Sequence, residues 1–242
     1  MTLTKTGIEY GEFAWNFYPG CRHQQQGVCT VKNCWAKAMA RRHGNPDFEP
    51  RLIAELLDAP LKRRKPARIL VNFMGDLFGD WVNPYQPVMF QGAAETLASA
   101  VQWVVTASPQ HTFLFLTKAP WNISKWQIDW PDNSWIGATA TDLKTAGRAL
   151  YAGLNRVQAK NKWLSLEPVR DATHIVANDL RLVGIKWVVI GAQSRPDVMP
   201  KLEWVRDIVE AADAAGVPVW EKDNLKPLLK TLRQDCPKEW KK

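Results

Sequence analysis

The chain has 242 residues and a formal net charge of +8, and 46% of its residues are hydrophobic. This composition supplies a sizeable core and excludes wholesale disorder. No apolar run approaches the roughly 20 residues that cross a bilayer, and the first residues lack the apolar stretch of a secretory signal, so we expect a cytoplasmic protein with no membrane segment.

Strand-like and helix-like segments alternate along the chain, which favours a single α/β domain over residues 1–242. The expected strands are short and apolar on both faces, as in a buried parallel sheet. They fall at residues 10–18, 68–73, 112–116, 134–138, 162–166, 185–190 and 217–221. The expected helices fall at residues 34–43, 51–58, 87–107, 142–160 and 201–215. This alternation predicts a partial or complete (β/α) barrel of parallel strands, or a doubly wound sheet.

Polar or glycine-containing turns follow most of the expected strands. In both architectures ligands bind at the carboxyl ends of the strands, so these turns are where a site is expected. The turns are Gly75-Asp76, Thr117-Lys118, Thr139/Thr141, Glu167, Gln193-Ser194 and Lys222-Asp223.

Three of the four cysteines lie close together, in a loop over residues 19–35 that leads into an expected helix. In a reducing compartment, clustered cysteines are more often metal ligands or catalysts than disulfides. A loop with three thiolates leaves one iron of an iron–sulfur cluster open to a small molecule. The spacing matches neither a compact ferredoxin run nor paired zinc knuckles. Three interpretations are therefore open: an iron–sulfur cluster on Cys21, Cys29 and Cys34, a zinc site completed by His23 or His43, or unrelated buried cysteines.

A series of short motifs covers nearly the whole chain in one order. They are Trp15-Asn16 with Gly20-Cys21, Asn33-Cys34-Trp35-Ala36, Met74-Gly75-Asp76-Leu77-Phe78-Gly79-Asp80-Trp81, Pro109-Gln110-His111-Thr112-Phe113, Leu116-Thr117-Lys118, Ser165-Leu166-Glu167-Pro168, Trp187-Val188-Val189-Ile190-Gly191 and Ala215-Gly216-Val217-Pro218. On these motifs the chain resembles the phage-associated three-cysteine-motif proteins, a family that is similar to divergent radical S-adenosylmethionine (SAM) enzymes.

The resemblance implies a radical SAM-like barrel with a 4Fe-4S cluster held by Cys21, Cys29 and Cys34. The amino and carboxylate groups of SAM would chelate the fourth iron, and one electron would cleave SAM to methionine and a 5′-deoxyadenosyl radical that abstracts hydrogen from a substrate. Such chemistry needs an electron donor such as a flavodoxin or ferredoxin. A separately encoded partner protein is a further expectation.

Four residues after the second and third expected strands are candidate SAM contacts beside the cysteine loop. Asp76 could accept hydrogen bonds from the methionine ammonium, and Gly75 would let backbone approach closely. Thr117 and Lys118 suit the SAM carboxylate or a substrate anion. The structural alternative for Gly75-Asp76 is a turn that simply ends a strand, and the alternative for Lys118 is an ion pair at the barrel rim.

Two residues near the C-terminal half complete the candidate set. Glu167 could bind the SAM ammonium or ribose, and its structural alternative is a salt bridge to a neighbouring Lys or Arg. Gln193 follows an apolar strand at a place where an adenine or ribose could lie against backbone.

The net charge and the aromatic residues near the expected site, Trp15, Trp35 and Trp81, favour a nucleic-acid base as substrate. The basic run at residues 62–65 precedes its strand, so we expect a solvated connection there. Two rival hypotheses remain. One is a non-enzymatic nucleic-acid-binding module with a structural zinc. The other is a barrel scaffold that acts with a partner and holds iron without cleaving SAM.

Overall fold

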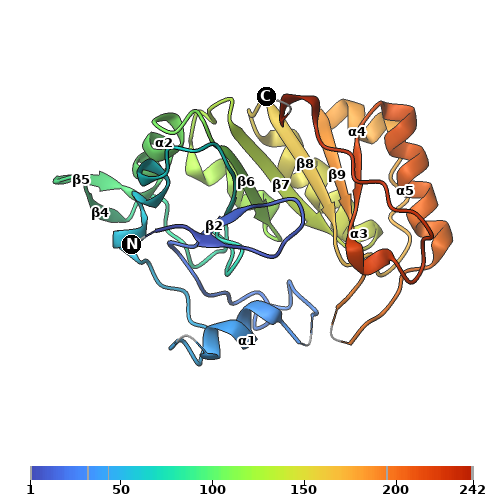
Figure 1. The fold of residues 1–242 in the computed structure, drawn as a ribbon, viewed down its shortest axis with the longest axis horizontal. Helices are drawn as coiled ribbons and strands as arrows, with labels where there is room; N and C mark the ends of the chain where they lie inside the picture. Colours follow the sequence, from blue (N-terminus) through green and yellow to red (C-terminus); the bar gives the residue numbers. More distant parts are fainter. Residues whose placement is uncertain (1, 32, 43, 195, 241–242) are drawn as a thin grey trace. The chain divides into compact units, whose positions relative to one another are not determined.

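The computed structural model describes residues 2–31, 33–42, 44–194 and 196–240 (Figure 1). The chain divides into two compact units. The first unit is Met1–Trp135 with Gln158–Lys160, and the second is Ile136–Val157 with Asn161–Lys242. Both units combine helices with mostly parallel strands. Among the described residues, no helix has the length and apolar character needed to cross a membrane.

The sheet of the first unit has the strand order β1-β2-β3-β6. β1 (Thr4–Lys5) pairs antiparallel with β2 (Phe13–Trp15), which runs parallel to β3 (Arg68–Val71). β3 in turn runs parallel to β6 (Thr112–Thr117). The apolar sequences of β3 and β6 are almost wholly buried, as expected of parallel strands covered on both faces. Their carboxyl ends therefore lie at one edge of the sheet.

A β-hairpin replaces the first half of the helix that we expected over residues 87–107. β4 (Pro87–Phe90) and β5 (Ala93–Thr96) pair antiparallel, and α2 (Leu97–Thr106) begins only afterwards. Gln91 and Gly92 both have positive φ, the backbone that a two-residue hairpin turn needs. Figure 1 shows the hairpin projecting beside α2. The helical prediction was wrong here because the sequence pattern did not reveal this turn.

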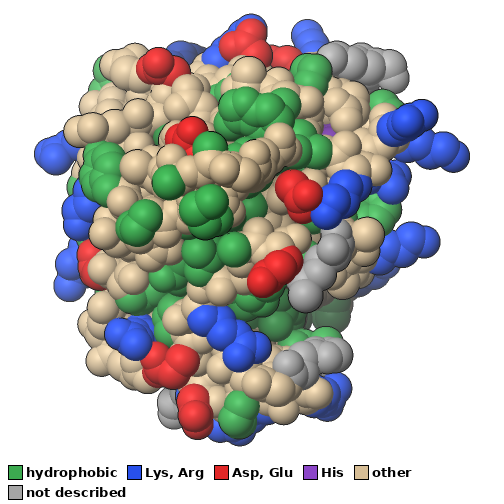
Figure 2. Space-filling view, turned by 90° about the vertical axis from the view of Figure 1, so that its left-hand side faces the viewer, with side chains coloured by type: hydrophobic (Ala, Val, Ile, Leu, Met, Phe, Trp, Pro, Cys, Tyr) green, Lys and Arg blue, Asp and Glu red, His purple; other side chains and the backbone are tan. Residues whose placement is uncertain are grey.

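The remaining elements of the first unit are short. α1 (Trp35–Arg42) follows the cysteine loop, and three 3-10 helices lie at Ala54–Leu56, Ala59–Lys62 and Pro120–Trp126. Within residues 51–58, where we expected a helix, the structure has the single 3-10 turn Ala54–Leu56. His43, the expected end of α1, lies outside the described residues. Figure 2 views one face of the molecule, on which apolar side chains are exposed between charged ones.

The second unit contains three adjacent parallel strands, β8 (Asn161–Leu166), β9 (Ile185–Ile190) and β10 (Val219–Glu221). Between them along the chain come α4 (Ala177–Val183) and α5 (Leu202–Ala215), which pack side by side. β7 (Ser134–Ala140) begins in the first unit and ends in the second, and all seven of its residues are buried.

In the second unit, the structure differs from one expected helix, over residues 142–160, and agrees with another, over residues 201–215. The expected helix over residues 142–160 is α3 (Leu143–Gly147), then a π-helical turn and a 3-10 turn. α5 ends at Gly216, whose φ of 71° and N–H bonds to the last carbonyls make a left-handed C-cap. α4 lies in a stretch for which we expected no regular element.

These strands confirm the α/β class with a mostly parallel arrangement. The expectation of one domain over residues 1–242 stays a prediction.

Candidate metal centre and its carboxylate network

The cysteine loop starts at the carboxyl ends of three neighbouring parallel strands. Cys21 follows β2, Asp76 follows β3, and Thr117 is the last residue of β6. Parallel pairing places these three strand ends together, so residues far apart in the sequence meet at one edge of the sheet. The structure thus brings together Cys21, Gly75, Asp76, Thr117 and Lys118 of the predicted site.

Two asparagines fasten the segment after β2 to the turn after β3. The amide oxygen of Asn72 accepts the N–H of Tyr18 at 2.9 Å, and that of Asn16 accepts the N–H of Met74 at 3.1 Å. The N–H of Gly20 also donates to the carbonyl of Met74 at 3.0 Å. These bonds satisfy backbone N–H groups that lie beyond the ends of the strands. They also fix the position of one turn against the other.

The two glycines of this region allow backbone segments to approach closely. A Cβ at Gly75 would lie 2.5 Å from the carbonyl oxygen of Gly20. Gly20 has a φ of 106°, and a Cβ there would lie 2.4 Å from the carbonyl oxygen of Glu49. We predicted that Gly75 would let the backbone approach SAM closely, and this contact with SAM stays a prediction. In the structure Gly75 admits the chain's own segment that leads to Cys21.

All three loop cysteines are free, partly buried thiols. Cys21 and Cys34 pack against a small apolar cluster of Ala36, Ala40 and Phe48, so α1 and the thiols share one local core. Burial raises the pKa of the Cys21 thiol to about 12; the backbone N–H of His23 lowers this pKa, while Asp76 and the other two thiols raise it. Cys21 is therefore held as a neutral thiol, and metal binding there would release a proton.

The donor set of the loop fits an iron–sulfur cluster in its chemistry. Thiolates are the ligands that such clusters take, and Cys21 lies within electrostatic range of Cys29 and Cys34. Among the described residues, no group of three Cys, His, Asp or Glu side chains converges closely enough to hold a metal ion. The loop thus supplies three thiol ligands, but in the described part of the chain they are not gathered around a common metal position.

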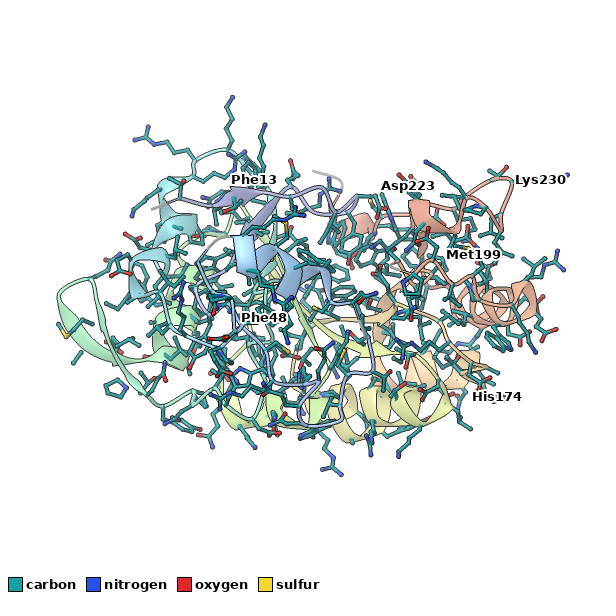
Figure 3. All side chains as sticks on the ribbon, turned by 90° about the horizontal axis from the view of Figure 1, so that it is seen from below. Phe13, Phe48, His174, Met199, Asp223 and Lys230 are labelled. Atoms are coloured by element: carbon teal, nitrogen blue, oxygen red, sulfur yellow. The ribbon has the colours of Figure 1, made fainter. Side chains whose placement is uncertain are left out.

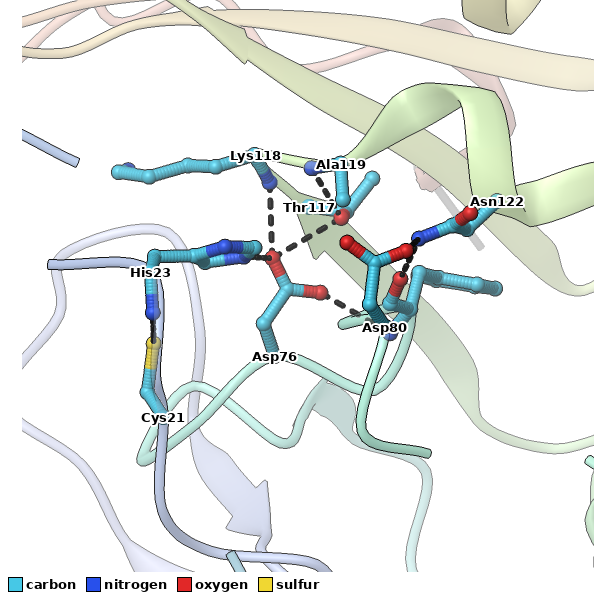
Figure 4. Close-up of polar contacts among 9 residues, drawn as sticks. Cys21, His23, Asp76, Asp80, Thr117, Lys118, Ala119 and Asn122 are labelled. Atoms are coloured by element: carbon cyan, nitrogen blue, oxygen red, sulfur yellow. Dashed lines mark hydrogen bonds and ion pairs between the residues drawn. The ribbon is translucent and has the colours of Figure 1, made fainter. Parts of the chain in front are cut away.

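Asp76 is the centre of a buried hydrogen-bond network (Figure 4). Its Oδ2 accepts bonds from Nε2 of His23 at 2.7 Å, the hydroxyl of Thr117 at 2.9 Å and the N–H of Lys118 at 2.8 Å. Its Oδ1 accepts the N–H of Phe78 at 2.9 Å. The side chain is 5% exposed. One carboxylate therefore connects the cysteine loop, the turn after β3 and the end of β6.

The network keeps Asp76 ionised. Burial by itself raises the pKa of the carboxyl, but the hydrogen bond and charge of His23, with the bonds from Lys118 and Thr117, outweigh it and lower the pKa below its ordinary value. An ionised carboxylate only accepts hydrogen bonds, so Nε2 of His23 is the donor. Nδ1 of His23 is buried and has no hydrogen-bond partner among the described residues.

Lys118 contributes its backbone to this network, and its side chain extends past His23 away from the Asp76 carboxylate (Figure 4). Thr117 donates to Asp76 and accepts the N–H of Ala119 at 2.8 Å. The Thr117 hydroxyl thus uses its one donor and one of its two acceptor positions inside the chain. The predicted contacts of Thr117 and Lys118 with SAM or an anion remain predictions.

The three tryptophans expected near the site lie in three different environments. Trp15 is 1% exposed and donates its indole N–H to the carbonyl of Leu56, so it belongs to the core. Trp81 packs edge-on against the His23 ring, with 4.8 Å between ring centroids. Trp35, at the start of α1, is 47% exposed.

In the second unit, Glu167 forms the salt bridge that we named as its structural alternative. Its Oε1 lies 2.6 Å from Nζ of Lys222, with side chains 26% and 14% exposed. The two residues follow β8 and β10, and Gly191 follows β9 between them. A Cβ at Gly191 would lie 3.0 Å from Glu167 and 3.2 Å from Lys222, so the glycine leaves room for the pair.

Gln193 lies at the same strand ends of the second unit. Its amide oxygen accepts from a guanidinium nitrogen of Arg170 at 3.0 Å, and its amide nitrogen donates to the carbonyl of Pro196. The side chain of Asn224 bonds both the N–H and the carbonyl of Ala192. Gln193 and Glu167 thus share one strand-end cluster, while their predicted roles toward SAM stay predictions.

The sequence did not show that His23 contacts Asp76. We had considered His23 only as a zinc ligand, because a contact across 53 positions leaves no spacing signal. The second zinc candidate, His43, lies outside the described residues. Asn122 was also missed; its amide donates to Asp80 and to the carbonyl of Phe78, which fixes the turn that follows Asp76.

Comparison with known proteins gives a family and no activity. No curated protein and no solved structure matches this chain. One family model, described as "Protein of unknown function (DUF5131)", matches residues 5–226. Because that match covers most of the sequence, the chain belongs to the DUF5131 family.

Proposed function

We propose that this chain is a radical SAM-type enzyme on a partial or complete barrel, with a 4Fe-4S cluster on Cys21, Cys29 and Cys34. The observation that supports it most is three free thiols in one loop, with Cys21 anchored at the carboxyl ends of parallel strands beside the Asp76 network. When bound, the cluster and SAM would supply one-electron cleavage of SAM and hydrogen abstraction from a substrate.

In this proposal the chain's own residues position and shield the cofactors. Asp76 already accepts four hydrogen bonds from the chain. Its part is therefore to fix His23, Thr117 and the Lys118 backbone relative to Cys21. The Lys118 ammonium, directed away from Asp76, is the cation suited to the SAM carboxylate or a substrate anion. Glu167 and Gln193 are proposed SAM contacts within the second unit.

The partners in this proposal are an electron donor such as a flavodoxin or ferredoxin, a nucleic-acid substrate and a separately encoded partner protein. The net charge of +8 supports a polyanionic substrate.

A specific observation favours the rival, a nucleic-acid-binding module with a structural zinc. A histidine that binds zinc commonly donates its other ring N–H to a carboxylate. His23 has this arrangement, because Nε2 donates to Asp76 while Nδ1 has no hydrogen-bond partner among the described residues. A Cys3His site would use Nδ1 of His23 with Cys21, Cys29 and Cys34.

Metal analysis after anaerobic purification and reconstitution tests the two candidates. The proposed enzyme should hold about four irons and four sulfides per chain, with an EPR signal of the reduced protein that changes on adding SAM. Substitution of Cys21, Cys29 or Cys34 by alanine should remove the iron, and Cys236→Ala is the matched control that should keep it.

His23→Ala separates the two sites within the same experiment. A cluster held only by thiolates survives the loss of the imidazole, whereas a Cys3His zinc site loses a ligand. One zinc per chain that falls with His23→Ala, in protein without iron, would overturn the radical SAM proposal.

A further inference from the structure

α1 has one buried face, and that face is made of small residues. Ala36 and Ala40 are 5% and 6% exposed and lie one helical turn apart, against Phe48. Figure 3 shows α1 with the labelled Phe48 beside it. Cys21 and Cys34 are partly buried against the same cluster. The opposite face of α1 is therefore turned to solvent next to the cysteine loop.

The solvent face begins with Trp35. The chain has thirteen tryptophans, and the large buried ones, such as Trp163 and Trp187, are fully enclosed. Trp35 is 47% exposed and takes no part in the Ala36–Ala40–Phe48 cluster. A half-exposed indole offers a flat surface on which a nucleobase can stack, whatever the base.

The charge of α1 has a single sign. Its sequence contains Lys37, Arg41 and Arg42 and no acidic residue, and Arg41 and Arg42 are exposed. Residues 21–51 hold six Lys or Arg against two acidic residues. One of those acids, Glu49, is paired with Arg22 at 2.6 Å. Within the residues that the structure describes, Lys37, Arg41 and Arg42 take part in no ion pair, so the positive charge of α1 can attract a polyanion outside the chain.

In the other basic segment, residues 62–65, two of the four cations have partners within the chain. Lys62 pairs with Asp58 at 2.7 Å, and the guanidinium of Arg63 lies 4.0 Å from the centre of the Phe13 ring. That aromatic ring is already covered by the arginine. Among the helices of the described residues, α1 alone combines an exposed indole with exposed arginines.

We propose that the outer face of α1 binds single-stranded nucleic acid, with a base stacked on Trp35 and phosphates against Arg41 and Arg42. Trp35 and Arg42 lie two helical turns apart, about 10 Å along the axis, so one short strand reaches both ends. Cys34 immediately precedes Trp35, which places the bound strand beside the proposed cluster. The substrate role of this strand rests on the proposed function, whereas the binding itself does not.

Fluorescence anisotropy of a labelled mixed-sequence 20-nucleotide DNA or RNA strand tests the proposal on reconstituted protein. Trp35→Ala should weaken binding roughly tenfold to hundredfold, the range for loss of one stacked base. The matched control is Trp103→Ala, which removes another tryptophan of the first unit that is 48% exposed and should leave the affinity within about twofold.

The charges are tested by salt titration of the same complex. Arg41→Ala with Arg42→Ala should reduce the slope of log affinity against log salt by about 1.4, since each phosphate contact on a single strand contributes about 0.7. Arg64→Ala with Lys65→Ala removes two exposed cations elsewhere in the first unit and should leave the slope unchanged.

Iron content is measured on every sample, so failure of binding and failure of the cluster are separable. Iron present, with no strand bound or with Trp35→Ala no weaker than Trp103→Ala, overturns the nucleic-acid proposal alone. Equal binding to duplex DNA or to poly-glutamate overturns it as well. Strand binding that depends on Trp35 in a chain without iron or SAM cleavage supports the proposal and overturns only the enzymatic function.

Discussion

Nε2 of His23 donates a 2.7 Å hydrogen bond to Oδ2 of Asp76, although 53 positions separate the two residues. Both side chains are buried, at 2% and 5% exposure. The bond attaches the cysteine loop to the turn after β3. It also gives a buried carboxylate one of the partners that compensate for its lost hydration.

His23→Ala should lower the free energy of unfolding by about 1.5–3 kcal/mol, the usual contribution of a hydrogen bond to a charged group. Urea unfolding measures it. In a double-mutant cycle with Asp76→Asn, the coupling energy should be about 1–3 kcal/mol. Arg22→Ala is the control, because the neighbouring ion pair of Arg22 with Glu49 is half-exposed and contributes under about 1 kcal/mol. An equal loss in both variants would contradict the prediction.

Acid should remove the contribution of Asp76. A carboxyl whose pKa is lower in the folded chain stabilises the fold above its unfolded value, here 3.8, and this contribution is lost as pH falls through the folded pKa. The stability difference between wild type and Asp76→Asn should therefore shrink as pH falls below about 4. Urea unfolding at each pH checks this, and a difference that stays constant down to pH 2 would contradict it.

Gly75→Ala should destabilise the fold, because its Cβ would lie 2.5 Å from the backbone oxygen of Gly20 and 2.9 Å from that of Tyr18. Backbone atoms cannot move aside as a flexible side chain can, so the substitution should lower the free energy of unfolding by about 1–3 kcal/mol or more. Gly7→Ala is the matched control, since a Cβ there meets no atom within 4 Å. Thermal unfolding of the two variants should show a lower midpoint for Gly75→Ala only.

Glu167 and Lys222 should be coupled in the second unit. Each is partly buried, so Glu167→Gln or Lys222→Met alone should lower the free energy of unfolding by about 1–3 kcal/mol. The double variant should lose less than the sum, because no charge is then left without its partner. Urea unfolding of the four proteins measures the coupling, and strictly additive losses would show that the pair contributes no interaction energy.

The sequence predicts those parts of the fold that depend on local apolar runs. The runs at residues 68–73 and 185–190 are strands in the structure, because a buried parallel strand must be apolar on both faces. The hairpin at Pro87–Thr96 was missed because a positive φ at Gln91 leaves little trace in the sequence. The predicted strand-end residues Asp76 and Thr117 do meet, since parallel strands bring their ends together.

What the sequence does not predict at the site is which donors Asp76 uses. We considered His23 as one of two histidines that could complete a zinc site, and the structure shows that its Nε2 also bonds a carboxylate from another strand end. Nothing in local spacing reports such a partner, because the contact is created by the pairing of β2 with β3. Glu167 likewise needed the structure to reveal Lys222, 55 positions further along.

The bonds to Asp76 join residues that are 41, 42 and 53 positions apart. Closing loops of that length costs chain entropy before any contact is gained, so such contacts form late on a folding pathway. α2, capped locally by Thr96, needs no such closure. We therefore expect α2 to form before the Asp76 network. A nascent chain that ends before Asp76 would carry the cysteine loop without the His23 bond, and one that ends before Thr117 would lack the bonds from the end of β6.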